Sequence, residues 1–217
     1  MCGGYSDGLC EVCFRSLPRT EQAELRGNSM EQALIGDVYD SVAAQKAMHL
    51  VRGAAFLFYE KDHPVQQAIH KMKYADQPMI GYQFGRMAAL EMQYADFFDG
   101  IDIIVPIPLH PIRLRERGYN QAEYISRGIS EVTGIPIDTT HVTRERNTPK
   151  QALQRGDERK QNVNNAFAVN HPEQFYHKHI LVVDDLVTTG ETMRSCLKAM
   201  KRFRGAKFSV FALCKAR

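Results

Sequence analysis

The chain has 217 residues, of which 44% are hydrophobic, and its formal net charge at pH 7 is +3. This length and composition allow one full hydrophobic core and a small additional module. No apolar run approaches the roughly 20 residues that cross a bilayer, and no signal-like pattern opens the chain, so we expect a cytoplasmic protein without membrane insertion. A net charge this small does not by itself indicate a nucleic-acid partner.

The five cysteines form a poor disulfide framework, because their number is odd and they fall into two distant groups. Cys10 and Cys13 make one C-x-x-C pair, and Cys2 precedes it. Three thiols do not complete a structural zinc site, so ordinary surface or core cysteines remain the alternative. Cys196 and Cys214 are interpreted as small core residues of a helix and a strand.

The chain is predicted to contain three segments. Residues 1–20 have no periodic apolar pattern and cannot build a core alone. Residues 21–52 resemble a connector with one or two helical turns, interrupted at Gly36. The main domain is expected to span residues 53–217.

The main domain is predicted to begin with a strand over residues 54–59, which are rich in aromatic side chains. Asp62 is expected to cap a helix that starts across Pro64 and ends before Pro78. A second helix follows, and four of its residues are expected to face inward, namely Phe84, Met87, Ala88 and Met92.

A β-branched run over residues 101–105 predicts the next strand, and residues 120–132 carry apolar side chains at helical spacing. Short strands are predicted over residues 135–137 and 141–144. The polar segment 145–165 is long for a loop inside a compact domain, and such loops tend to be functional lids. We interpret it as a lid.

The last third predicts a buried strand over residues 180–183, a helix over 192–202 and a final strand over 208–213. Strands that alternate with helices favour an α/β fold, in which a largely parallel sheet is covered by helices on both faces.

The most informative segment is residues 180–192, because its parts suit one task. Four aliphatic residues lead to the carboxyl end of a strand, where open α/β sheets bind ligands. Asp184 and Asp185 would repel a phosphate, and therefore suit the two hydroxyls of a ribose. Gly190 permits a tight turn into a helix whose N-terminal amides can hold a phosphate. The hydroxyls expected beside the 5′-phosphate are Thr188, Thr189 and Thr192.

This segment is similar to the phosphoribosyl pyrophosphate motif of the type I phosphoribosyltransferases over all of residues 180–192. The resemblance implies that the loop binds the ribose phosphate through Asp184, Asp185, Leu186, Val187, Thr188, Thr189, Gly190 and Thr192. The remaining interpretation of the pattern is a buried strand followed by an acidic turn without a ligand.

A second segment, VPIPLHPIRLRERGYNQA over residues 105–122, also lies between a strand and a helix. Its predicted loop carries three arginines, whose planar forks match phosphate oxygens in pairs. Together with TPKQAL, RKQN and VDDLVTTG, the segment resembles the ComF family over nearly the whole chain. The resemblance implies a type I phosphoribosyltransferase-like parallel sheet flanked by helices.

The resemblance also implies roles for individual residues. Arg113 and Arg117 become candidates for the pyrophosphate. Residues 148–161 resemble the mobile loop of related transferases, with contacts expected from Gln151, Arg155 and Arg159. The arginines have a simpler interpretation as a solvated loop or a nucleic-acid track.

ComF-like proteins usually begin with two cysteine pairs in a zinc ribbon. If Cys2 is the second thiol of the first pair, its partner would lie before Met1. Residues 1–20 are therefore expected to be a truncated zinc-ribbon-like remnant, with Cys2, Cys10 and Cys13 as an incomplete zinc set.

Three functions remain open at this point. The first is transfer of a phosphoribosyl group with displacement of pyrophosphate at ribose C1, linked to DNA uptake, with Mg²⁺ bound mainly through substrate and water and Zn²⁺ as a second candidate metal. No residue stands out as a base. The second is a non-catalytic competence accessory protein that binds single-stranded DNA and other DNA-uptake proteins, with a sensor or vestigial phosphoribosyl site. The third is a regulator that only senses phosphoribosyl pyrophosphate.

Overall fold

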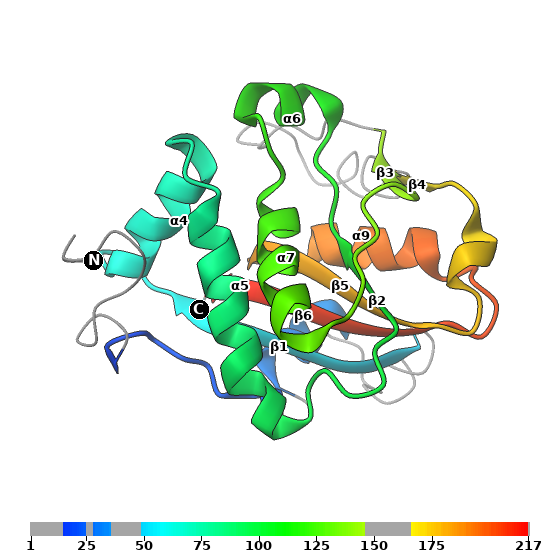
Figure 1. Cartoon of the computed structure of the whole chain (residues 1–217), viewed down its shortest axis with the longest axis horizontal. Helices are drawn as coiled ribbons and strands as arrows, with labels where there is room; N and C mark the ends of the chain where they lie inside the picture. Colours follow the sequence, from blue (N-terminus) through cyan, green and yellow to red (C-terminus); the bar gives the residue numbers. More distant parts are fainter. Residues whose placement is uncertain (1–14, 25–27, 36–48, 146–165, 217) are drawn as a thin grey trace.

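Four parallel strands form the central sheet of the computed structural model, which describes residues 15–24, 28–35, 49–145 and 166–216 (Figure 1). The strand order is β1-β6-β5-β2, and neighbouring strands pair in parallel throughout. The bounds are Leu50–Tyr59 for β1, Ile103–Pro106 for β2, His179–Val187 for β5 and Lys207–Ala216 for β6. The predicted α/β architecture with a parallel sheet flanked by helices is therefore confirmed.

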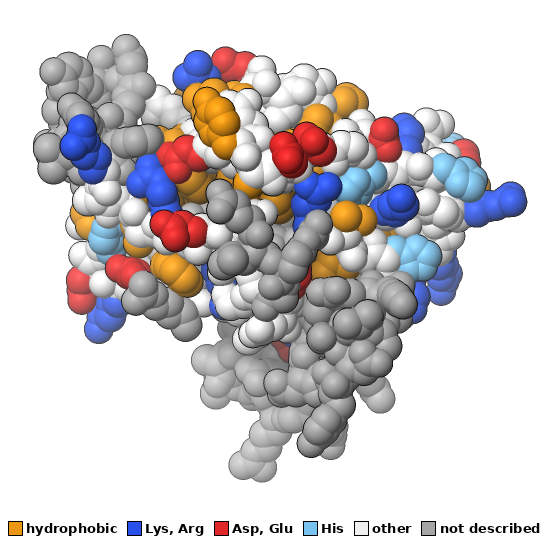
Figure 2. All heavy atoms as spheres, turned by 90° about the horizontal axis from the view of Figure 1, so that it is seen from below, with side chains coloured by type: hydrophobic (Ala, Val, Ile, Leu, Met, Phe, Trp, Pro, Cys, Tyr) orange, Lys and Arg blue, Asp and Glu red, His pale blue; other side chains and the backbone are white. Residues whose placement is uncertain are grey.

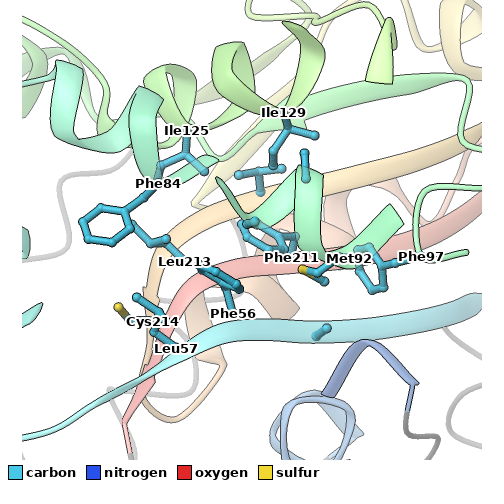
Figure 3. Packing of buried hydrophobic residues seen from close by; sticks show 14 of the residues in the cluster. Phe56, Leu57, Phe84, Met92, Phe97, Ile125, Ile129, Phe211, Leu213 and Cys214 are labelled. Atoms are coloured by element: carbon cyan, nitrogen blue, oxygen red, sulfur yellow. The ribbon is translucent and has the colours of Figure 1, made fainter. Parts of the chain in front are cut away.

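One face of the sheet is covered by α4 (Pro64–Tyr74), α5 (Met79–Met92) and α7 (Gln121–Thr133). Phe84 of α5, Ile125 of α7 and Phe211 of β6 belong to one hydrophobic core, and Figure 3 labels their side chains between the helices and the sheet. Three of the four residues expected inward on α5 are buried, and Met87 is packed against the same core while partly exposed. The three helices and this face of the sheet enclose the first hydrophobic core.

The opposite face is covered by α2 (Ser29–Ile35) and α9 (Glu191–Met200). Successive residues of β5 alternate between the two cores: Leu181 and Val183 belong to the first, Ile180 and Val182 to the second. This alternation explains why residues 180–183 are all aliphatic, since both faces of a sheet with helices on each side are dry.

The strands β3 (Val142–Arg144) and β4 (Phe167–Val169) pair as a small antiparallel sheet. In the chain, β3 precedes residues 146–165 and β4 follows them. The predicted lid over 145–165 lies outside the described residues except for Glu145. The strand β4 was not predicted, because three residues after a polar segment are too few to show the alternation of apolar and polar side chains typical of a strand.

The N-terminal segment covers the outer edge of β1. The backbone N–H of Phe58 donates to the carbonyl of Pro18, and the N–H of Thr20 donates to the carbonyl of Phe56. Farther along the edge, the N–H of Gly53 donates to the carboxylate of Glu31, which is itself buried. Edge strands need such cover to avoid pairing with other chains. The predicted division of the chain at residue 53 remains a prediction.

Several predicted boundaries are wrong. Asp62 is not the cap of α4, because the ring of His63 accepts the capping hydrogen bond from the N–H of Val65. Residues 111–117 form a helix, α6 (Pro111–Arg117), where a loop was expected, since His110 caps it and Gly118 ends it in the left-handed conformation. Ile137 makes only an isolated bridge to Ile104.

The described chain is completed by three short 3₁₀ turns: η1 (Gln22–Glu24), η2 (Gln93–Ala95) and η3 (Pro172–Phe175). Within the described ranges, no helix combines the length and the apolar character needed to span a bilayer.

Candidate functional site

The strand β5 continues to Val187, so Asp184 and Asp185 lie within the last few residues of the strand and not after it. The expectation that the strand ends at Val183 is therefore wrong, because cross-strand pairing to β6 extends through Leu186 and Val187. The two acids consequently alternate between the faces of the sheet. Asp185 is directed to the side of α4 and Asp184 to the side of α9 and β3.

Asp185 is buried and forms an ion pair with Lys73, near the end of α4. The Nζ of Lys73 lies 2.9 Å from Oδ1 of Asp185, and the two side chains are only 16% and 13% exposed. A carboxylate this poorly solvated needs a partner charge or strong donors, and Lys73 provides both.

Asp184 is half-buried, and its Oδ1 accepts a hydrogen bond of 2.8 Å from the backbone N–H of Asp185. Burial, followed by the negative charge of Asp185, raises the pKa of Asp184 to about 7. The positive charges of Lys73 and Arg144 oppose this rise. The site therefore combines one acid that is paired with Lys73 and a second acid that holds a proton more tightly than an ordinary aspartate does.

Two buried thiols lie below the acids. Burial raises the pKa of Cys196 to about 12, and it raises the pKa of Cys214 as well. Both cysteines belong to the cores, as the sequence predicted, and both stay neutral.

The turn after β5 exposes Thr188 and Thr189 and then passes through Gly190, whose φ is 76°. No side chain caps the N-terminus of α9, which leaves its first amides available to an anion. Thr192 is half-buried in that first turn. Val187 is 2% exposed, so a role in binding would fall to its backbone.

Gly190 is required for a steric reason as well as for its φ. A Cβ at this position would lie 2.6 Å from the carbonyl oxygen of Ala33 in α2. The same carbonyl accepts a hydrogen bond from the guanidinium of Arg194. The last turn of α2 thus packs directly on the turn that was predicted to hold the phosphate.

The helix α6 presents the predicted pyrophosphate residues. Arg113 is half-buried, and its Nη1 lies 3.1 Å from the carboxylate of Glu116. Arg117 donates to Oε1 of Gln121 at 2.9 Å, and its guanidinium lies over the ring of Tyr74, 5.3 Å from the centroid. α6 follows β2, which pairs with β5, so its arginines and the two acids lie at the same end of the sheet.

Two cations of the site were not singled out from the sequence. Lys73 is 112 residues from Asp185, and nothing in the pattern of α4 distinguishes it from other solvated lysines. Arg144 lies on β3, within the strand predicted over residues 141–144, and no motif marked it as a site residue. Burial lowers the pKa of Arg144 and the charge of Asp184 opposes this, which places the guanidinium within electrostatic reach of that acid.

The remaining predicted residues lie outside the described part of the chain, namely Gln151, Arg155, Arg159, Cys2, Cys10 and Cys13. Within the described part, no group of three or more His, Cys, Asp or Glu side chains could hold a metal ion. The described residues around Asp184 and Asp185 therefore do not fit a Mg²⁺ ion held by protein ligands alone. They do fit an ion that is bound mainly by phosphate oxygens and water, which are ligands that Mg²⁺ prefers.

Comparison with known proteins shows the family to which the chain belongs. Residues 87–217 match the phosphoribosyl transferase domain family. The chain is 32% identical over 155 residues to DNA utilization protein YhgH of Escherichia coli (strain K12), with 70% of this chain and 67% of that protein covered. It is 30% identical over 213 residues to the protein of the same name from Salmonella typhi, covering 96% and 90% of the two chains.

Competence protein F of Haemophilus influenzae is 29% identical over 157 residues, which covers 70% of this chain and 69% of that protein. A solved structure described as the allosteric regulatory enzyme of purine biosynthesis aligns with 17% identity and a TM-score of 0.36, over 64% of this chain and 25% of that one. By its domain match and its relatives, the chain belongs to the ComF family within the type I phosphoribosyltransferase superfamily.

Proposed function

We propose that the chain binds phosphoribosyl pyrophosphate at the carboxyl ends of β5 and β2 and transfers its phosphoribosyl group, in a role linked to DNA uptake. The observation that carries the proposal is the placement of Asp184 and Asp185 near the end of β5, where a short turn leads into the N-terminus of α9, which no side chain caps. The acids suit the hydroxyls of a ribose, and the amides of α9 suit an anion one turn away.

The ligand would extend from α9 toward α6. Its 5′-phosphate would be held by Thr188, Thr189 and the amides after Gly190, where side chains are exposed or half-buried. Its pyrophosphate would face Arg113 and Arg117 of α6. These arginines are already oriented by Glu116 and Gln121, so less side-chain entropy is lost when they bind.

The reaction that fits this arrangement is displacement of pyrophosphate from C1 of the ribose by an acceptor. The bond from C1 to the pyrophosphate oxygen breaks, its electrons leave with pyrophosphate, and the acceptor forms the new bond to C1. Arginines near the leaving group stabilise the negative charge that develops there. Mg²⁺, when bound, would neutralise part of the same charge from the substrate side.

The test is calorimetric titration with phosphoribosyl pyrophosphate and Mg²⁺, followed by a pyrophosphate-release assay with amine and nucleobase acceptors. The variant D184N/D185N should lose binding by roughly 100-fold, since two charge-assisted hydrogen-bond acceptors are weakened at once. D62N is the matched control, because Asp62 is exposed and remote from β5 in sequence. Unchanged affinity in D184N/D185N would contradict the placement of the ribose.

A second function is binding of single-stranded DNA without catalysis. The names of two relatives, DNA utilization protein YhgH and competence protein F, favour it. On the face shown in Figure 2, the described acidic and basic side chains are interspersed and form no field of one sign. Among the described residues, a DNA track would use another surface, such as α6 with its three arginines. Its affinity for a single-stranded oligonucleotide should fall steeply with salt, and a flat salt dependence would remove this function.

A further inference from the structure

The last turn of α4 contacts three separate parts of the candidate site. Lys73 pairs with Asp185 of β5 at 2.9 Å. The neighbouring Tyr74 stacks under the guanidinium of Arg117 on α6, 5.3 Å from the ring centroid. The carbonyl of Met72 accepts a hydrogen bond of 2.6 Å from the hydroxyl of Tyr119, which follows α6. One helical turn therefore connects the acids of the sugar site to the basic helix.

Lys73 is the one member of this turn that brings a charge into contact with the acid pair. Both partners of the ion pair are largely withdrawn from water, with 16% and 13% of their side chains exposed. An ion pair so placed is sensitive to the loss of one partner, because the remaining charge is left poorly solvated. When a nearby positive charge is removed, a poorly solvated acid favours its neutral, protonated form.

The charges around the acids come from every element packed against them. Lys73 reaches them from α4 and Arg144 from β3, while Arg113 of α6 influences Arg144. The thiols of Cys196 on α9 and Cys214 on β6 lie within electrostatic reach and are neutral. Lys73 contacts this pair of acids directly, through the 2.9 Å hydrogen bond from its Nζ to Oδ1 of Asp185.

We propose that Lys73 is a positioning residue of the sugar site: its ion pair holds the carboxylate of Asp185 in place for the ribose, and its helical turn sets the place of α6. The inference rests on the proposed function and adds a residue that neither the sequence motif nor the family match indicates. Lys73 acts through Asp185 and through Tyr74, not by touching the reacting atoms.

The pH dependence of binding separates this role from simple structural support. Without the ammonium group, the acid pair binds a proton more tightly, and a protonated carboxyl is a poorer acceptor for a ribose hydroxyl. The affinity of K73M for phosphoribosyl pyrophosphate with Mg²⁺ should then fall by roughly 10-fold at about pH 6.5 and recover most of that loss at about pH 8.5. K73R, which keeps the charge, should stay within a few-fold of wild type at both values.

The experiment is calorimetric titration of wild type, K73M, K73R and K71M across this pH range. Lys71 lies on the same helix with an exposed side chain, so K71M controls for the loss of a lysine from α4. K73Q, which retains a hydrogen-bond donor, serves as the second neutral variant if K73M does not fold, and the same pH-dependent loss is expected.

The outcomes are distinct. Binding by wild type with an equal loss in the neutral variants at every pH, or with no loss, overturns the role of Lys73 while the proposed function stands. Failure of wild type to bind phosphoribosyl pyrophosphate at any pH overturns the proposed function, and the inference with it. A loss in K73M that appears only at the lower pH and is absent in K73R and K71M supports the inference.

Discussion

Gly85 of α5 lies against the main chain of Ile125 in α7, so closely that a Cβ on Gly85 would stand 2.1 Å from the carbonyl oxygen of Ile125. The contact is reciprocal, because a Cβ on Gly128 of α7 would stand 2.1 Å from the carbonyl oxygen of Tyr82. The two helices therefore touch through their backbones. Since α7 begins four residues after α6 ends, this contact also limits where the C-terminal end of α6 can lie.

The variant G85A should lower the free energy of unfolding by about 3 kcal/mol, because the helices must separate to admit one methyl group. G134A is the control: its Cβ meets nothing within 4 Å, and only the positive φ of 72° is strained. That strain costs roughly 1 kcal/mol. Urea denaturation measures both, and an equal loss in the two variants would contradict the close contact.

The raised pKa of Asp184 predicts that this acid costs stability. Its pKa in the folded protein, about 7, exceeds the ordinary value of 3.8. The folded state therefore holds the proton more tightly, and stability is lost as the pH rises from about 4 through 7.

We accordingly expect D184N to be more stable than wild type at about pH 8, by on the order of 2 kcal/mol or more, and the gain should be less than half as large at about pH 5. Thermal unfolding at the two pH values measures this difference. A gain of the same size at both would show that packing, and not charge, is responsible. The same variant should bind phosphoribosyl pyrophosphate more weakly, which would make Asp184 a residue retained for function at the expense of stability.

His179 predicts the opposite response to acid. Its Nδ1 lies 3.1 Å from the carbonyl of Gly100 and its Nε2 lies 2.8 Å from the hydroxyl of Ser209, an arrangement that suits a neutral ring. Burial, followed by the charge of Arg52, lowers the pKa of His179 from 6.5. Its contribution to stability is then complete above about pH 6.5 and is lost as the pH falls below that value.

The variant H179N should therefore show a flatter decline of melting temperature between about pH 6.5 and 5 than wild type. Its stability at neutral pH should be lower by roughly 1 to 2 kcal/mol, because Ser209 loses its buried partner. Parallel pH profiles for the two proteins would mean that His179 binds protons equally in the folded and unfolded states, which would contradict its lowered pKa.

The arginines of α6 can be tested by comparing two ligands. R117M should lower the affinity for phosphoribosyl pyrophosphate by roughly 10-fold and leave the affinity for ribose 5-phosphate nearly unchanged, since only the former ligand carries a pyrophosphate. R115M is the control, because Arg115 lies on the same helix with an exposed side chain. Equal weakening of both ligands by R117M would place Arg117 away from the pyrophosphate, or would show that loss of its contact with Tyr74 displaces α6.

Local patterns were sufficient where one short stretch carried all of the information. The helix predicted over residues 120–132 is confirmed as α7, which Asn120 caps and Gly134 ends. The four aliphatics of β5 predicted a buried strand because both of its faces meet helices. Residues 111–117 were misassigned for a related reason: three arginines suggested a solvated loop, whereas the His110 cap and Pro111 start a helix.

The sequence by itself determined the α/β class and the order of acids, hydroxyls and glycine at the end of β5, because these depend on neighbours within a dozen residues. Tertiary structure alone decided the sheet order β1-β6-β5-β2 and brought Lys73 to Asp185 across 112 residues. The physical reason is that a partner for a buried charge is selected by the packing of distant elements, and no periodicity along the chain records which elements will meet.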